Sequence, residues 1–216
     1  MSIAEKLQTI AENESKVFEA GKKAEYDRFW DAYQQNGNRT HYVSAFTFLG
    51  WTDVTYQPKY PIISDAPFGL QRVFDNSQIV DTKVPLIMRG LGNIGALFNG
   101  CTYLKRIPSL ILELPVTNTV NTFANCINLE EINISCVNDG CFAVSFDIHW
   151  STKLNKASWV SIINALSSAT SGLSITGSLA SVKKAFETGE GANDGDTSAE
   201  WASLESSKSN WTISLV

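Results

Sequence analysis

The feature that most constrains this chain is a short phrase of sequence that occurs twice. The shared positions hold one Phe, one Cys, one Leu and one Ile in the same order. These positions are Phe98, Cys101, Leu104 and Ile107 in the first copy, and Phe123, Cys126, Leu129 and Ile132 in the second. A unit of about 25 residues cannot bury its apolar side alone, so it must stack on its neighbours. We therefore expect these eight side chains to form a repeat core.

Weaker copies extend the pattern on both sides. Phe74 precedes Phe98, and Leu154 follows Leu129, at nearly the same interval. Degenerate outer copies are typical of terminal repeats, which act as caps. A period of 20–29 residues with Leu, Ile, Asn and Cys at fixed places predicts a leucine-rich-repeat solenoid. The expected fold class is α/β, with about four irregular coils.

Residues 2–35 predict one long N-terminal helix, the stalk of a first domain over residues 1–36. Apolar residues recur at the spacing of a coiled-coil seam, and Asn36 and Gly37 supply a stop signal. The seam residues of this expected oligomerisation helix are Ile3, Leu7, Ile10, Val17 and Ala24. Because so thin a seam is marginal in water, the helix needs a partner. That partner is either identical helices in a homo-oligomer or the body of the same chain.

Two further domains are expected after the helix. Residues 37–66 form an aromatic-rich connecting segment, and residues 67–216 form the solenoid with a C-terminal cap of helix–strand units. An aromatic stripe near the end of the helix has two interpretations, packing against the connecting segment or a platform on which sugars stack. The stripe consists of Tyr26, Phe29, Trp30 and Tyr33. In the cap, Ser158 is expected to start a helix, and residues 173–176 and 211–216 are expected to be strands.

Composition limits the classes of partner. A net charge of −5 and a pI near 5.1 argue against nucleic acid, which needs a basic face, and against an anionic membrane surface. No apolar run approaches the roughly 20 residues that span a bilayer. The N-terminus also lacks the basic and apolar regions of a secretory signal. Export would therefore use another route or occur as part of a particle.

The four cysteines allow two interpretations. Cys101 and Cys126 repeat in register, which suits small buried side chains. Cys136 and Cys141 flank a four-residue turn and could pair across it. No ligand spacing typical of zinc is present.

A glycine-rich stretch at residues 90–95 has the spacing of a dinucleotide-binding fingerprint. Pro85 suits the preceding strand poorly, and Pro108 would stop the following helix. The alternative is a turn between two coils.

A second stretch, residues 193–196 with Glu200, suggests calcium but lacks the ligand order of an EF-hand loop. A solvated loop is the alternative. His41 and His149 have no evident nucleophile or base beside them. We therefore expect no catalytic residues, no cofactor and no metal.

The repeated Phe-x-Gly/Asn-Cys-x-x-Leu-x-x-Ile phrase, with residues 116–118 before its second copy, resembles the BspA-like leucine-rich repeats. Residues 20–37 resemble the leader of phage and prophage members of that group, found in gut bacteria. Residues 210–213 resemble their usual ending. The resemblance implies a non-enzymatic virion component, associated with a phage tail or baseplate, that binds a receptor or decorates the particle. Its partners would then be other tail proteins.

The alternative that the resemblance leaves is a bacterial surface or secreted adhesin that binds host protein or glycan. In either role, the expected binding surface is the concave strand face or the rim loops of the solenoid. Tyr103 and Phe142 are candidates for an exposed aromatic contact, and the alternative for each is a place in the core.

Overall fold

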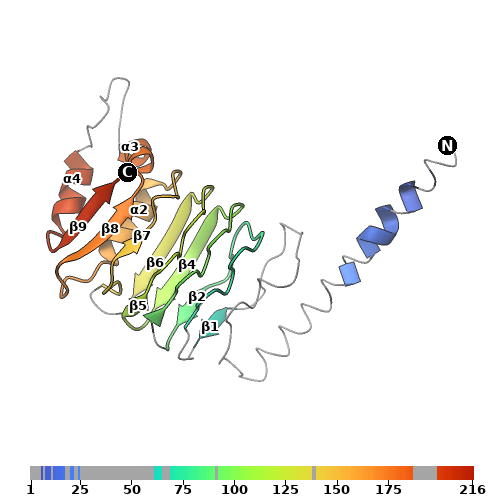
Figure 1. Ribbon diagram of the computed structural model, residues 1–216, viewed down its shortest axis with the longest axis horizontal. Coiled ribbons are helices and arrows are strands. Elements are labelled where there is room, and N and C mark those ends of the chain that lie inside the picture. Colours follow the sequence, from blue (N-terminus) through green and yellow to red (C-terminus); the bar gives the residue numbers. More distant parts are fainter. Residues whose placement is uncertain are drawn as a thin grey trace. The chain divides into compact units, whose positions relative to one another are not determined.

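The computed structural model describes residues 6, 8–10, 12–17, 20–21, 24, 61–64, 69–90, 92–137, 140–186 and 199–216 (Figure 1). The chain divides into two compact units, Met1–Arg39 and Thr40–Val216, and each is considered by itself. The elements of the second unit are β1 (Ile62–Ser64), β2 (Leu86–Met88), β3 (Gly92–Asn93), β4 (Arg106–Leu112), β5 (Val116–Asn118), β6 (Glu131–Cys136), β7 (Phe146–Asp147), α2 (Lys156–Asn164), β8 (Leu173–Gly177), α3 (Leu179–Phe186), α4 (Ala199–Ser206) and β9 (Trp211–Leu215).

Parallel pairing joins the described strands into three sheets. The largest has the order β1-β2-β4-β6, and the others are β3-β5 and β7-β8-β9. In the largest sheet, paired residues lie one repeat apart in the sequence, as Ile62 with Leu86 and Arg106 with Glu131. The repeat period of the sequence therefore equals the sequence separation between paired residues in the sheet. Each copy of the phrase lies beside the next (Figure 1).

The predicted fold class, a solenoid with a long N-terminal helix, is wrong. The structure is a mixed α/β arrangement in which parallel strands are divided among separate sheets and the helices are short. In the first unit, the longest unbroken helical run among the described residues is 12–17. Helices α2, α3 and α4 have only eight or nine residues each.

Two physical reasons account for the correction. The apolar seam of the first unit is thin and contains Gly21, which lowers helix stability relative to Ala. In the second unit, α2 follows Leu154 directly and interrupts the repeat spacing. Most of the predicted connecting segment, residues 37–60 and 65–66, lies outside the described residues.

The eight expected repeat-core side chains are all buried, none with more than 1% of its surface exposed. Phe98 stacks on Phe74 with ring centroids 5.4 Å apart, and on Phe123 at 6.0 Å. Stacked rings of this kind add to the stability gained from burial alone. The core therefore consists of columns of identical side chains that run across the repeats.

The buried cysteines form a second column. Cys101 Sγ donates to the carbonyl of Phe74 at 2.9 Å, and Cys126 Sγ donates to the carbonyl of Phe98 at 3.1 Å. Burial raises the pKa of Cys101 to about 12 and also raises the pKa of Cys126. Both thiols are therefore protonated donors at neutral pH.

The other two cysteines, Cys136 and Cys141, form a disulfide, which selects one of the two alternatives that the sequence left open. Their Cα atoms lie 5.5 Å apart. The bond joins the last residue of β6 to the segment that follows it.

Helix α2 closes one edge of the largest sheet. The N–H of Ile132 donates to Ser158 Oγ at 2.9 Å, and the N–H of Ile134 donates to Ser161 Oγ at 2.7 Å. These hydroxyls occupy positions where a further strand would otherwise pair. The N-cap of α2 is Asn155, whose Oδ1 accepts from the N–H of Ser158, so the predicted cap at Ser158 is wrong.

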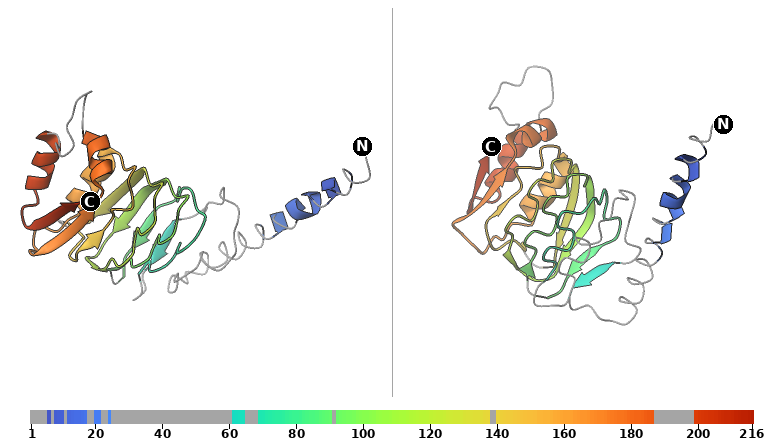
Figure 2. Two further views of the ribbon diagram at one scale, coloured as in Figure 1. Left: turned by 45° about the horizontal axis from the view of Figure 1, so that its top comes forward. Right: turned by 45° about the vertical axis from the view of Figure 1, so that its right-hand side comes forward.

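The C-terminal elements pack around an aromatic cluster. The expected strands at 173–176 and 211–216 correspond to β8 and β9, and α3 and α4 gather at the same end of the unit (Figure 2). Trp201 lies 5.5 Å from Trp159 and 5.3 Å from Phe186, measured between ring centroids. Among the described helices, none is long and apolar enough to cross a membrane.

Candidate functional site

The stretch with the spacing of a dinucleotide-binding fingerprint, residues 90–95, lies where the backbones of two neighbouring repeats come close together. Gly92 and Asn93 form β3, which pairs with β5, and residues 95–100 form turns where a dinucleotide site would have a helix. A Cβ on Gly92 would lie 1.9 Å from the carbonyl oxygen of Pro115. The glycine is therefore required by the close approach of two backbones.

The calcium-like loop at residues 193–196 lies outside the described residues. Its other expected member, Glu200, forms an ion pair with Lys156. Within the part of the chain that the structure describes, no group of three His, Cys, Asp or Glu side chains is arranged to hold a metal ion.

The seam residues of the first unit are described in part. Ile10, Val17 and Ala24 are exposed in the single chain, whereas Ile3 and Leu7 lie outside the described residues. The aromatic stripe at residues 26–33 also lies outside them.

The two aromatic candidates for ligand contact have different environments. Phe142 is completely buried and lies against Phe146, with ring centroids 4.5 Å apart. Tyr103 has 52% of its surface exposed. Tyr103 therefore remains a candidate, and Phe142 belongs to the core.

Tyr103 is one of three large exposed side chains on consecutive repeats. The others are Ile127, with 46% of its surface exposed, and Trp150, with 42%. All three lie within two residues of the buried column formed by Cys101, Cys126 and Ser151. We refer to Tyr103, Ile127 and Trp150 together as the turn rim.

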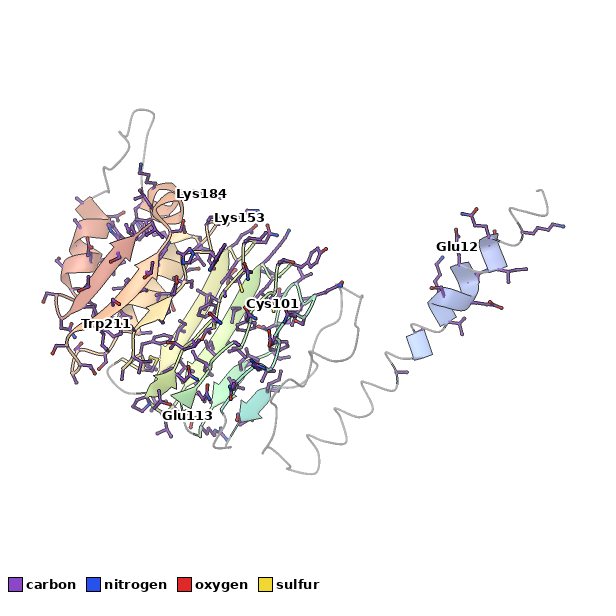
Figure 3. All side chains as sticks on the ribbon, in the orientation of Figure 1. Glu12, Cys101, Glu113, Lys153, Lys184 and Trp211 are labelled. Carbon is purple, nitrogen blue, oxygen red and sulfur yellow. A yellow bond between two sulfur atoms is a disulfide. The ribbon has the colours of Figure 1, made fainter. Side chains whose placement is uncertain are left out.

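Hydrogen bonds show that these repeats are direct neighbours. Asn128 Nδ2 donates to the carbonyl of Thr102 at 2.7 Å, and Lys153 Nζ donates to Asn128 Oδ1 at 2.6 Å. Since neighbouring strands lie about 4.8 Å apart, the rim extends over about 10 Å from the first repeat to the third. In Figure 3, Lys153 lies at the end where the strands begin, opposite Glu113 at the end where they finish.

Turn geometry explains how the rim is presented. Asn76, Gly100 and Asn125 occupy one repeat position, and each has a positive φ, of 56°, 72° and 61°. Trp150 follows at the same position. The N–H of Thr152 donates to its carbonyl at 3.1 Å, as the N–H of Thr102 does to that of Gly100 at 2.9 Å. The last repeat therefore keeps the hydrogen bond of the turn while replacing a small residue with an indole.

The indole has a polar neighbour. The His149 ring lies 4.6 Å from that of Trp150, and its Nδ1 lies 2.5 Å from Asp147 Oδ1. The same carboxylate oxygen accepts from the N–H of His149 at 2.9 Å. Asp147 thus fixes the ring that lies beside the exposed tryptophan.

A charged hollow of about 430 Å³ adjoins the rim. Its walls are Val80, Asp81, Lys83, Lys105, Arg106 and Glu130. Lys105 lies two residues beyond Tyr103, and Glu130 lies two residues beyond Asn128, so the hollow and the rim share the same turns. Buried Leu104 lies between exposed Tyr103 and Lys105.

Asp81 organises the charges of the hollow. Its side chain is 6% exposed; it accepts from Arg106 through Oδ2 and from the N–H of Lys83 through Oδ1 at 2.8 Å. Among the described residues, Lys83, Lys105 and Glu130 form no ion pair with their side chains. The groups left for a ligand are therefore two ammonium groups, one carboxylate and the exposed part of the Arg106 guanidinium.

Sequence reasoning missed most of this site, although two signals were present. Asp81, Arg106 and Glu131 stand one repeat apart and carry alternating charge, which places them in one row across paired strands. Continuing the position of Gly100 and Asn125 by one more repeat reaches Trp150. The two free lysines have no such signal.

Comparison with known proteins adds no relative: no family model, no curated protein and no solved structure matches this chain.

Proposed function

We propose that this chain is a non-enzymatic binding protein whose turn rim contacts a ligand on another molecule or cell. The observation that carries the proposal is the exposure of Tyr103, Ile127 and Trp150 on three neighbouring repeats, beside a hollow with charged walls. A single exposed apolar side chain needs no explanation, but a row beside polar groups is typical of interaction sites. Tyr and Trp are also enriched at the centres of interfaces.

The particular role that we propose is that of a tail- or baseplate-associated component of a phage virion, with receptor binding or decoration as its task. Support for this comes from the resemblance of the repeat, the leader and the ending to phage members of the BspA-like group. The Cys136–Cys141 disulfide is consistent with a place outside a reducing cytosol. The disulfide equally favours the second candidate, a bacterial surface or secreted adhesin that binds host protein or glycan.

The binding role is tested by changing the rim in the full chain. We expect the double variant Tyr103→Ala/Trp150→Ala to lose most of its binding to cells of the host bacterium, measured with fluorescently labelled protein by flow cytometry. The matched control is Leu114→Ala/Val120→Ala, because Leu114 and Val120 are also exposed but lie outside the rim. Equal binding by the two variants would contradict a binding role for the rim.

The virion role is tested by mass spectrometry of purified particles from a phage that encodes the chain. Peptides of this protein should co-purify with tail proteins. Their absence from the particles, together with their presence on the bacterial surface, would favour the adhesin.

We also propose that copies of the chain associate through the first unit. Ile10 and Val17 are exposed apolar side chains in the single chain, and burying them between copies would remove apolar surface from water. Sedimentation should give a mass above that of one chain, and Ile10→Gln/Val17→Gln should lower it. The control Glu12→Gln/Glu14→Gln should leave the mass unchanged, and a monomeric wild-type chain would contradict the proposal.

A further inference from the structure

We infer that the ligand of the turn rim is an acidic glycan, whose carboxylate or sulfate group occupies the charged hollow while a sugar ring lies on Tyr103. This inference rests on the proposed binding function and names the chemical class of ligand at that same site. It follows from three properties of the hollow and the rim: the balance of free charges, a guanidinium held in place, and an exposed aromatic side chain two residues along the chain from a lysine of the wall.

The free charges of the hollow favour an anion. Asp81 is engaged by Arg106 and by the N–H of Lys83, so its negative charge is already compensated. Among the residues that line the hollow, the two lysines, Lys83 and Lys105, are accompanied by one uncompensated carboxylate, that of Glu130. In a chain with a net charge of −5, this local excess of positive charge sets the hollow apart from the average surface and would attract an anionic group.

Arg106 is held in an orientation suited to a carboxylate or sulfate. Buried Asp81 takes one arm of its guanidinium, while about half of the side chain remains exposed. The planar guanidinium presents several N–H donors in a fixed geometry and binds oxyanions through paired hydrogen bonds. Because Asp81 already fixes the group, less side-chain entropy is lost when a ligand binds.

The remaining groups distinguish an acidic sugar from a simple anion. Glu130 is a hydrogen-bond acceptor in the same wall, which suits the hydroxyl groups of a sugar. Tyr103, two residues from Lys105, offers an exposed ring on which the apolar face of a sugar can lie. Trp150, two repeats further along the rim, offers a second ring about 10 Å away, so an extended glycan can contact both.

The test is isothermal titration of the full chain with three acidic probes: sialyllactose, trigalacturonate and a heparin tetrasaccharide. Lactose and maltotriose serve as neutral probes, and tetraglutamate tests for attraction by charge alone. We expect at least one acidic sugar to bind more tightly than the neutral sugars and tetraglutamate. Its binding should weaken as salt screens the charges.

Substitutions then locate the binding. Lys105→Gln should weaken binding of the acidic sugar about tenfold, the usual effect of losing one charge-assisted hydrogen bond. Its control is Lys184→Gln on α3, an exposed lysine outside the hollow, which should have no effect. Tyr103→Ala should also weaken binding, while Leu114→Ala should not.

Three outcomes would overturn the inference: no acidic sugar binds, a neutral sugar or tetraglutamate binds as tightly, or Lys105→Gln behaves like Lys184→Gln. The proposed function fails separately, when Tyr103→Ala/Trp150→Ala leaves cell binding intact. Loss of cell binding by that double variant without any binding of acidic sugars would retain the rim and reject the glycan.

Discussion

The inner and outer sides of the same repeats follow opposite rules. On the inside, Phe74, Phe98 and Phe123 hold one position, and their rings stack in a column. On the outside, a few residues further along the chain, the repeats of Phe98 and Phe123 and the repeat that follows them present tyrosine, an aliphatic side chain and tryptophan. The column forces each repeat to resemble its neighbours, because every ring is the packing surface of the next. The rim is free of that constraint, so its side chains can vary to suit a ligand.

The largest expected effect tests the inner side. Phe98→Ala removes the ring that touches both neighbours in the column and should lower the free energy of unfolding by about 3–5 kcal/mol. Tyr103→Ala, on the outer side of the same repeat, should change it by less than about 0.5 kcal/mol. Urea unfolding monitored by circular dichroism measures both. Similar losses in the two variants would remove the distinction between core and rim.

A second prediction concerns the turn between the two sides. Gly100 has a φ of 72°, and a Cβ there would lie 2.2 Å from Asn76 Oδ1. Gly100→Val should therefore cost about 2 kcal/mol of unfolding free energy, chiefly from left-handed backbone strain. Trp150→Val, at the same repeat position but without a positive φ, should cost less in the same urea experiment. A larger loss for Trp150→Val than for Gly100→Val would contradict the role of the positive φ at Gly100.

A third prediction tests the sheet edge against the exposed sheet surface. Ser161→Ala leaves the buried N–H of Ile134 without its acceptor and should cost about 1–2 kcal/mol. Ser135→Ala changes an exposed serine of β6 itself and should stay within about 0.5 kcal/mol. Thermal unfolding compares the two, and a neutral Ser161→Ala would mean that water replaces the hydroxyl.

The last prediction concerns the thiol column, whose effect on stability appears only at alkaline pH. The pKa of Cys101 is raised from 9.0 to about 12 by burial, so the folded chain holds a proton that the unfolded chain releases first. This contribution to stability is complete below pH 9 and is lost as pH rises towards 12. Cys101→Ser should fold, since Ser77 and Ser151 occupy the same repeat position, and should lose less stability than the wild type over that interval. Parallel pH profiles of the two proteins would exclude a role for this thiol.

The buried side of the repeats could be predicted from the sequence, because side chains that stack on one another recur at a fixed interval along the chain. Phe98 and Phe123 are identical since each must fit the ring beside it, and the interval between them reappears as the register of the strands. The turn rim shows no such periodicity, because Tyr103, Ile127 and Trp150 differ in residue type and each is displaced by one or two positions from the repeat position of the one before it. Lys83 and Lys105 are brought to one hollow by turns whose path no local pattern specifies.

Two predictions from the sequence, the Ser158 helix cap and the long N-terminal helix, were wrong for the same reason: local interactions compete with tertiary ones. Ser158 has the right chemistry for an N-cap, but its hydroxyl accepts from Ile132, and Asn155 caps the helix in its place. The seam from Ile3 to Ala24 has helical spacing but too little apolar surface to guarantee one long helix. In both cases the local pattern was real, but it did not by itself determine the structure.

The serine hydroxyls on α2 also determine where the repeat region can lengthen over evolutionary time. A duplicated repeat unit inserted before β6 would add one strand, widen the sheet by about 4.8 Å and keep Ser158 and Ser161 beside the last strand. The same duplication inserted between β6 and α2 would separate the hydroxyls from Ile132 and Ile134, and the new last strand would need matching donors. Descendants of this chain with longer or shorter repeat regions should therefore differ in the number of repeats upstream of β6 and retain the α2 serines.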